Sequence, residues 1–233
     1  MTDIRVKICG ITNRDDAIAA LAVGADYLGF NLYPKSSRYI PPEKVKQMIL
    51  DIGYWVLGRL DPIPNTQYPI PNPPRFVGIF VNETVQGITD ILTFTGLDYA
   101  QLHGDESPEY LQQLAGKAFK AVRPADAESA RDAASRFAPL GLHDGPQLLI
   151  DAYDPAEYGG TGKKADWHVA AELAQRHPRL MLAGGLTPAN VAQAIRAVRP
   201  WAVDVASGVE VSPGRKDHDA VRAFVRAANE SEQ

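Results

Sequence analysis

The sequence contains a single cysteine, Cys9, among 233 residues, so the chain has no partner for an intramolecular disulfide. This scarcity is typical of proteins in a reducing compartment. There is also no apolar run of the ~18 residues that a membrane-spanning helix needs. Charged residues follow the first methionine too soon for a secretory signal peptide. We therefore expect a cytoplasmic protein with no membrane partner.

Basic charge is not in excess. The 24 Lys and Arg residues are scattered along the chain and are outnumbered by 28 Asp and Glu residues, which gives a net charge of −4. This balance argues against nucleic acid as the partner, whereas a small anionic substrate held by local groups remains compatible with it. The length and the 45% hydrophobic content allow one large domain or two small ones.

Short apolar runs rich in Val, Ile and Phe alternate with longer segments whose apolar residues recur at helical spacing. The predicted strands are residues 5–9, 27–32, 76–81, 99–103, 118–122, 147–151, 180–183 and 202–206, and the predicted helices are 14–23, 42–52, 84–94, 108–114, 127–137, 167–176, 188–198 and 218–228. Near-continuous apolar strands indicate a parallel sheet covered on both faces. We therefore predict an α/β fold, a single (β/α)8 TIM barrel over residues 1–233. A doubly wound open sheet is the alternative, but the even repetition leaves no obvious switch point.

One segment interrupts this alternation. Residues 53–74, GYWVLGRLDPIPNTQYPIPNPP, contain six prolines, too many for a helix interior or a central strand. We predict an insertion between the second helix and the third strand, on the amino-terminal face of the barrel and away from the expected active site. A proline-stiffened surface excursion is favoured over a partner-docking segment.

Active sites of such barrels lie at the carboxyl ends of the strands, where the sequence places a thiol and a carboxylate. Cys9 ends the first strand, and Gly10 lets the backbone turn and leaves the sulfur facing the mouth. Its alternative is a small buried hydrophobic residue. Asp151 ends the sixth strand, where a carboxylate is costly to bury unless it is paired or needed, and capping of the next loop is its alternative. Because the first and sixth strands lie across the barrel from each other, the two side chains form a candidate base and acid.

Three further polar side chains are expected at the same mouth. Gln101 and His103 lie two residues apart on one strand and point to the same side. A hydrogen-bonded core pair and a pair of substrate contacts both remain open for them. No histidine or carboxylate cluster stands at ligand spacing from His103, so no metal is expected. Arg38, in the loop after the second strand, can grip a carboxylate through two parallel hydrogen bonds.

Glycine-rich turns follow the last strands. Gly184 and Gly185 come after the seventh strand, and Ser207 and Gly208 come after the eighth. Backbone N–H groups in these two loops form the recurrent phosphate site of the barrel, whereas tight turns without a ligand are the alternative. A third cluster, residues 159–163 (GGTGK), lacks the glycine spacing of a nucleotide-binding loop. It is either a lid over the acid or an exposed loop.

Together these segments resemble a known family. KICGIT, GADYLGFNLYPKSSRYI, VGIFVN, QLHGDE, GGTGKKADW, LAGGLTPANV and VDVASGVEVSPGRKD occur in the order found in phosphoribosylanthranilate isomerase of tryptophan biosynthesis, over nearly the whole chain. The resemblance implies a cofactor-free Amadori rearrangement of N-(5'-phosphoribosyl)anthranilate to 1-(2-carboxyphenylamino)-1-deoxyribulose 5-phosphate. It implies that Cys9 is the general base and Asp151 the general acid. The contacts expected for this phosphorylated substrate are Arg38 at the anthranilate carboxylate, Gly185, Ser207 and Gly208 at the phosphate, and Gln101, His103 and Asp204 elsewhere in the site.

Two departures and three alternatives accompany this resemblance. The proline-rich insertion is unusual for the family, but its predicted location leaves the site untouched. Ala206 stands where the family commonly has a serine, which removes one hydroxyl contact to the phosphate, although backbone amides can suffice. A phosphate-binding barrel without catalysis needs neither Cys9 nor Asp151. The sugar isomerase of histidine biosynthesis is expected to use two aspartates, whereas the first strand here ends in cysteine. We do not expect a fusion with indole-glycerol-phosphate synthase, because one barrel accounts for the 233 residues.

Overall fold

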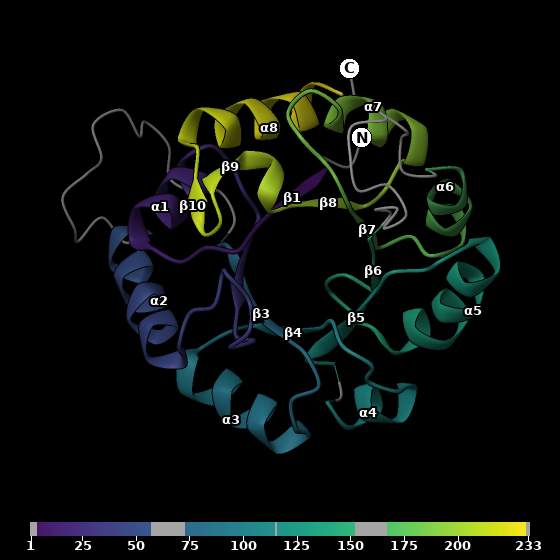
Figure 1. Cartoon of the computed structure of the whole chain (residues 1–233), viewed down its shortest axis with the longest axis horizontal. Helices are drawn as coiled ribbons and strands as arrows, with labels where there is room; N and C mark the ends of the chain where they lie inside the picture. Colours follow the sequence, from purple (N-terminus) through teal and green to yellow (C-terminus); the bar gives the residue numbers. More distant parts are fainter. Residues whose placement is uncertain (1–3, 57–72, 115, 152–166, 232–233) are drawn as a thin grey trace.

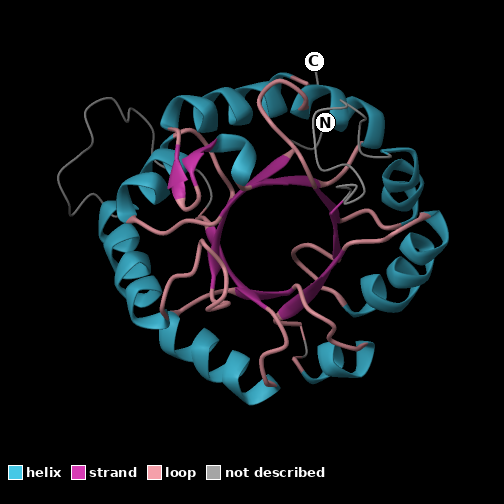
Figure 2. Ribbon diagram, viewed as in Figure 1, coloured by secondary structure: helices cyan, strands magenta, loops and turns pink. Residues whose placement is uncertain are grey.

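The computed structural model describes residues 4–56, 73–114, 116–151 and 167–231. Its centre is a closed barrel of parallel strands that pair in sequence order, with β1 paired to both β2 and β8. The strands are β1 (Arg5–Cys9), β2 (Tyr27–Asn31), β3 (Arg75–Phe80), β4 (Tyr99–Leu102), β5 (Ala118–Val122), β6 (Leu148–Asp151), β7 (Leu180–Ala183) and β8 (Ala202–Val205). Figure 2 shows this ring of strands inside a ring of helices. The predicted TIM barrel is confirmed, and the open sheet is wrong because the first and last strands pair.

A helix follows each strand of the barrel. These helices are α1 (Arg14–Ala22), α2 (Pro42–Val56), α3 (Val85–Thr95), α4 (Pro108–Gln113), α5 (Ala127–Phe137), α6 (Trp167–Arg176), α7 (Val191–Val198) and α8 (His218–Glu230). Several begin with a side chain that accepts a backbone N–H, namely Asn13, Thr84, Ser107, Asp126 and Asp217. Helix α8 lies between α7 and α1 and completes the outer ring (Figure 1).

The connections contain elements that the sequence pattern does not predict. A short 3-10 helix, η1 (Ala138–Leu140), follows α5, and a second one, η2 (Ser207–Val209), follows β8. Strands β9 (Glu210–Ser212) and β10 (Arg215–Lys216) then form a small antiparallel hairpin before α8. The loop after β8 therefore has a structure of its own at the barrel mouth.

Two predicted boundaries are wrong by more than two residues. Helix α7 begins at Val191 and not at residue 188, because the Asn190 side chain accepts the backbone N–H of Thr187 over 2.8 Å and holds the intervening residues in a turn. Helix α2 continues to Val56, so the predicted insertion does not begin at residue 53. The remainder of that segment, apart from residues 73 and 74 before β3, lies outside the described residues.

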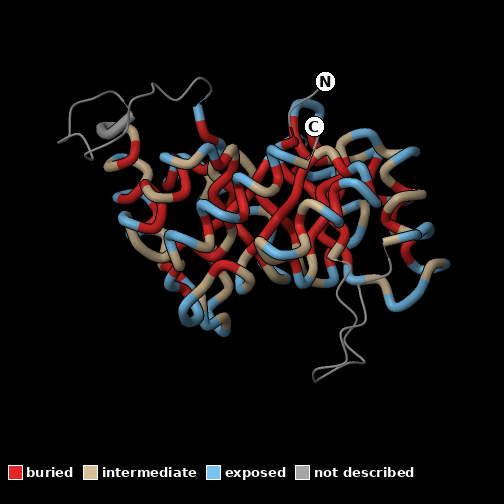
Figure 3. The backbone as a smooth tube through the Cα atoms, turned by 90° about the horizontal axis from the view of Figure 1, so that it is seen from above, coloured by how far each residue is buried: buried red, intermediate tan, exposed pale blue. Residues whose placement is uncertain are grey.

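The hydrophobic core has two layers. Strand residues such as Val6 and Ile8 face outward and pack against the helices. A second cluster fills the barrel interior with Tyr27, Val77, Phe119, Ala121, Leu149, Met181 and Ala202, to which Tyr99 and Trp201 add their rings. Figure 3 shows the buried strands running between two more exposed rims. Alternation along β1 sends Lys7 and Cys9 inward, so polar side chains lie above the apolar interior layer.

None of the described helices combines the length and the apolar character that a membrane span requires.

The turn that leads from η1 toward β6 leaves no room for a side chain. A Cβ at Gly141 would lie 2.1 Å from the carbonyl oxygen of Gln147. We expect Gly141→Ala to lower the free energy of unfolding by about 1–3 kcal/mol, because backbone has to move. A Cβ at Gly53, within α2, meets nothing within 4 Å, so Gly53→Ala is expected to raise that free energy by about 0.5–1 kcal/mol. Urea unfolding measures both, and equal stability of the two variants would contradict the prediction.

Candidate active site

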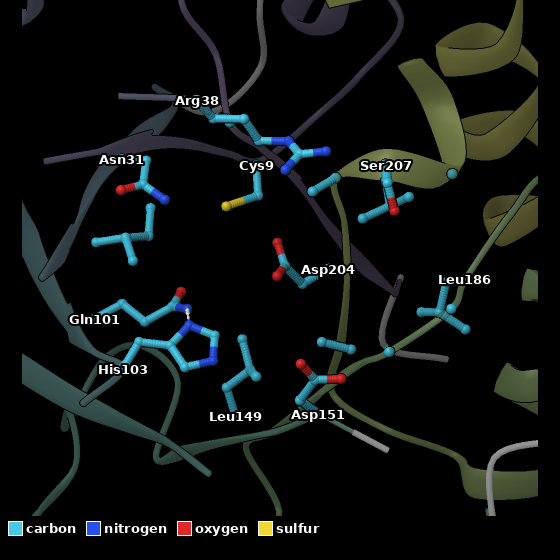
Figure 4. Close-up of a pocket in the computed structure, with 18 of the residues that line it drawn as sticks. Cys9, Asn31, Arg38, Gln101, His103, Leu149, Asp151, Leu186, Asp204 and Ser207 are labelled. Atoms are coloured by element: carbon cyan, nitrogen blue, oxygen red, sulfur yellow. Dashed lines mark hydrogen bonds between the residues drawn. The ribbon is translucent and has the colours of Figure 1, made fainter. Parts of the chain in front are cut away.

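The carboxyl ends of the strands surround a pocket of about 360 Å³, a size typical of small-molecule sites. Its lining includes every site residue expected from the sequence, namely Cys9, Arg38, Gln101, His103, Asp151, Gly185, Asp204, Ser207 and Gly208. Asn31 and Arg123 also line it and were not expected. Figure 4 shows the labelled side chains, among them Cys9, Gln101 and Asp151, converging on one space from different strands. The barrel thus assembles residues that are far apart in the sequence.

Cys9 and Asp151 lie on opposite sides of this pocket, and Asp204 lies between them in Figure 4. The thiol has room because Gly29 is its neighbour in the β1–β2 register. A Cβ at Gly29 would come within 2.8 Å of the Cys9 sulfur. Asp151 accepts a hydrogen bond from Arg123 Nε over 3.0 Å, and the Arg123 side chain is 68% exposed. A thiol and a carboxylate placed this way can exchange protons with a molecule held between them.

A buried lysine lies directly behind the cysteine. The Lys7 side chain has no exposed surface, and its ammonium donates to Asp204 Oδ1 over 3.0 Å and to Gln101 Oε1 over 2.8 Å. Burial by itself lowers the pKa of Lys7, but the negative charge of Asp204 and the neighbouring Cys9 raise it above its usual value. The ammonium therefore keeps its charge. The sequence indicated the orientation of this side chain, since Lys7 lies two residues before Cys9 on the same strand and alternation points both side chains to the same side.

The charges around Cys9 act on its thiol in opposite directions. Burial raises the pKa of Cys9, the charge of Lys7 lowers it, and the charge of Asp204 raises it again, so that the pKa lies above its ordinary value. In the free protein the proton therefore stays on the sulfur near neutral pH. Burial, and after it the negative charge of Asp204, therefore outweighs the activating effect of Lys7 on the thiol.

A carboxylate that was not expected, Glu210, holds Arg38 in place. Arg38 Nε donates to both carboxylate oxygens over 2.9 and 3.0 Å, and Nη2 donates to Oε2 over 2.5 Å. The hydrogen bonds with Glu210 raise the pKa of Arg38, although burial opposes this. Burial also raises the pKa of Glu210, but the hydrogen bonds from Arg38 and Lys216 outweigh it and lower that pKa. One edge of the guanidinium is thereby fixed by the protein.

Lys216, on the hairpin strand β10, connects this pair to the end of β1. Its ammonium donates to Glu210 Oε1 over 2.8 Å, to the carbonyl oxygen of Cys9 over 2.6 Å and to that of Ala206 over 3.2 Å. The side chain has no exposed surface. The hairpin after β8 is therefore anchored beneath the pocket rim, and the backbone that carries the thiol is anchored with it.

Gln101 and His103 form a hydrogen-bonded pair and also line the pocket. The two interpretations of their spacing, a hydrogen-bonded pair and a pair of substrate contacts, are therefore compatible. Burial, together with the positive charges of Arg123 and Lys7, lowers the pKa of His103 to about 3. The imidazole is therefore neutral. The described residues contain no group of three His, Cys, Asp or Glu side chains that could hold a metal ion.

The glycine turns after β7 and β8 pack on each other at the rim. Gly184 and Gly185 both have left-handed backbone angles, with φ of 102° and 60°. A Cβ at Gly208 would lie 1.9 Å from the carbonyl oxygen of Leu186, so only glycine lets these two loops approach this closely. Ser207 is exposed beside them. The glycine cluster at residues 159–163 lies outside the described residues.

The closed barrel and the polar pocket at the carboxyl ends of its strands define an enzyme of the (β/α)8-barrel class. Residues 65–227 match the family model of N-(5'phosphoribosyl)anthranilate (PRA) isomerase. The N-(5'-phosphoribosyl)anthranilate isomerase of Trichlorobacter lovleyi is 42% identical over 98% of this chain and 99% of its own. The corresponding protein of Thermotoga neapolitana is 41% identical over 97% of this chain and 98% of its own.

Solved structures agree with these sequence matches. The crystal structure of phosphoribosyl anthranilate isomerase from Thermotoga maritima superposes with a TM-score of 0.79 and 38% identity, covering 97% of this chain and 99% of that one. A second crystal structure of such an isomerase holds reduced 1-(o-carboxyphenylamino)-1-deoxyribulose 5-phosphate and superposes with a TM-score of 0.76 and 35% identity, covering 97% of this chain and 99% of that one. The chain belongs to the N-(5'-phosphoribosyl)anthranilate isomerase family and is an isomerase.

The reactivity of the single cysteine tests the electrostatics of the site. Because burial raises the pKa of Cys9, we expect alkylation by iodoacetamide to keep accelerating above pH ~8.5, where an unperturbed thiol is half ionised. Asp204→Asn removes a charge that raises this pKa, so its profile is expected to shift to lower pH. Alkylation in urea supplies the unperturbed profile of the same cysteine. A native profile that levels off below pH 8.5 would show that the charges are assigned wrongly.

Proposed function

We propose that this chain converts N-(5'-phosphoribosyl)anthranilate to 1-(2-carboxyphenylamino)-1-deoxyribulose 5-phosphate by general acid–base catalysis, as a step of tryptophan biosynthesis and without a cofactor. The observation that carries the proposal is the placement of Cys9 and Asp151 on opposite sides of one pocket in a member of this family. The relative that holds a reduced product analogue supports a phosphorylated sugar as the ligand.

The groups around the pocket suit the two ends of such a substrate. The turns at Gly185, Ser207 and Gly208 present backbone and a hydroxyl to the phosphate. Arg38 lies in the loop after β2 and serves the anthranilate carboxylate, with one guanidinium edge already held by Glu210. A substrate held at both ends spans the mouth, with its sugar between Cys9 and Asp151.

Proton transfers by Asp151 and Cys9 open the ring and form the enolamine, and a tautomerisation that moves a proton from the C2 hydroxyl to C1 completes the reaction. Asp151 donates a proton to the ring oxygen, the bond between that oxygen and C1 breaks, and the nitrogen lone pair forms a protonated Schiff base. Cys9, as the thiolate, removes the proton from C2, and those electrons form the enolamine. Tautomerisation gives the ketone at C2, so atoms and electrons balance without an external oxidant. Each such transfer typically contributes ~10² to 10⁴-fold in rate.

The cation behind the thiol supports this role for Cys9. Lys7 stabilises the thiolate, whereas Asp204 and burial oppose ionisation. A thiol whose pKa is raised forms a stronger base once it has lost its proton. Asp204, bound to Lys7, therefore has the supporting role of adjusting the strength of the base.

The proposal extends to the whole chain. We infer that residues 1–233 act as one barrel domain, because the described barrel strands all belong to the closed sheet and the relatives match over nearly their full length. The single cysteine supports a cytoplasmic location. The small phosphorylated substrate is the expected ligand, with no nucleic acid and no membrane involved.

Loss of either catalytic side chain is expected to abolish turnover. Cys9→Ala and Asp151→Asn are each predicted to lower kcat by ~10² to 10⁴-fold, since each removes one proton transfer. The decay of substrate fluorescence during conversion measures the rate. Asp90→Asn, which changes an exposed carboxylate on α3 that accepts a hydrogen bond from Gln86, is the matched control. Wild-type rates in both Cys9→Ala and Asp151→Asn would refute the mechanism.

A charge placed at the phosphate loops is expected to raise KM. Gly208→Asp puts a carboxylate beside the anion and also crowds the Leu186 carbonyl, so we predict a KM increase of more than ~10-fold. Gly208→Ala separates the two effects, because it crowds the same carbonyl without adding charge. Steady-state kinetics of both variants gives the comparison. If the aspartate variant binds as well as the wild type, the phosphate lies elsewhere.

A further inference from the structure

A chain of hydrogen bonds behind the pocket runs from a buried cation to a histidine nitrogen without a partner. Lys7 Nζ donates to Gln101 Oε1 over 2.8 Å, and Gln101 Nε2 lies 3.3 Å from His103 Nδ1 (Figure 4). The other ring nitrogen, His103 Nε2, is buried, and nothing in the described part of the chain forms a hydrogen bond with it. The chain therefore ends on an unsatisfied polar atom of a pocket-lining residue.

The ammonium fixes the direction of the Gln101 amide. An ammonium only donates, so the amide atom facing Lys7 has to be the carbonyl oxygen. The amide nitrogen is also a donor, and it then faces His103 Nδ1, which has to accept. The reversed amide would bring two donors together at Lys7 and leave an oxygen at His103. Asp204, 3.0 Å from the ammonium, keeps the cation in this position.

An accepting Nδ1 leaves the imidazole proton on Nε2. A second proton is disfavoured because burial and the nearby positive charges keep the ring neutral at physiological pH. The neutral ring thus presents one N–H donor that lacks an acceptor. Buried N–H groups without partners are rare in folded proteins, and this one calls for an acceptor that the described residues do not supply.

We propose that His103 Nε2 donates a hydrogen bond to an oxygen of the substrate's sugar, and that Lys7 and Gln101 are positioning residues that fix the required tautomer. The identity of the ligand rests on the proposed function, whereas the tautomer is a property of the free protein. In Figure 4 this nitrogen lies on the side of Leu149 and Asp151, away from Arg38 and Ser207. The sugar is the part of the substrate between those two ends, and its oxygens accept such a bond.

Nitrogen-15 NMR of the histidines tests the tautomer without substrate. The signals of His103 are those absent from His103→Gln, and we expect a protonated Nε2 and an unprotonated Nδ1 at pH 7. Gln101→Glu replaces the facing donor with an acceptor and is expected to bring a proton to Nδ1. Gln101→Met, of similar length, is expected to give a mixture of tautomers. A proton on Nδ1 of the wild type, or no change in Gln101→Glu, would overturn the proposal.

The reduced product analogue, 1-(o-carboxyphenylamino)-1-deoxyribulose 5-phosphate in its reduced form, tests the contact itself. We expect its binding to move the Nε2 proton resonance of His103 to higher chemical shift. Inorganic phosphate alone, which occupies only the phosphate loops, is expected to leave that resonance unmoved. An analogue that binds, as its own fluorescence change reports, without moving the resonance would overturn the contact.

Steady-state kinetics with phosphoribosylanthranilate tests whether catalysis needs the hydrogen-bond donor of His103. His103→Gln retains an N–H donor near the Nε2 position and is expected to keep kcat/KM within about 3-fold, while His103→Leu is expected to lose about 10- to 100-fold. Equal losses in the two variants would contradict a donor role. If the wild type shows the expected tautomer but does not convert phosphoribosylanthranilate, the proposed function is wrong and the tautomer assignment stands.

Discussion

The ion pair between Lys7 and Asp204 is the contact on which the rest of the site depends. A lysine ammonium without exposed surface costs several kcal/mol to bury unless a carboxylate and further acceptors compensate it. The register between β1 and β8 places Lys7 directly beside Asp204, so the compensation exists only when the barrel is closed. The same ammonium orients Gln101 from the opposite wall. Closure of the sheet and assembly of the pocket are therefore one event. The apolar layer of the barrel interior lies below the Lys7–Asp204 ion pair and excludes water from it.

The two sides of the mouth are built differently, in keeping with the roles proposed for them. On the cysteine side, buried Lys216 ties together Glu210, the carbonyl of Cys9 and the carbonyl of Ala206, so backbone and guanidinium are held before any ligand arrives. On the aspartate side, Asp151 forms an ion pair with Arg123, whose side chain is largely exposed. A base works best when its surroundings adjust its pKa and fix its position. An acid that has to regain a proton in every turnover benefits from contact with solvent.

Sequence patterns predicted the elements far better than the contacts between them. Apolar periodicity identified each strand because parallel strands are buried on both faces, and the carboxyl-end rule of the barrel brought Cys9 and Asp151 to one pocket. The start of α7 was missed because the Asn190 side chain forms a turn that a helix-start pattern does not reveal. Glu210 was missed because its partner Arg38 lies 172 residues away, and a single sequence contains no record of that proximity. The alternation that points Lys7 inward was visible, but its partners were not.

The balance of charge at the mouth explains how a chain with a net charge of −4 can bind an anionic substrate. Each carboxylate at or behind the pocket is already paired, with Asp204 bound to Lys7, Asp151 to Arg123, and Glu210 to both Arg38 and Lys216. Four cationic side chains therefore face three carboxyl groups there, one of which, Asp151, is the proposed proton donor, and His103 adds no charge because it is neutral. The surplus cation belongs to the Arg38, Glu210 and Lys216 group, at the end of the pocket where a carboxylate is expected. Electrostatic interactions over a few ångströms outweigh those with the distant surface charges, which solvent and salt screen. The surplus positive charge at the pocket, and not the net charge of the chain, therefore decides which ligand is attracted.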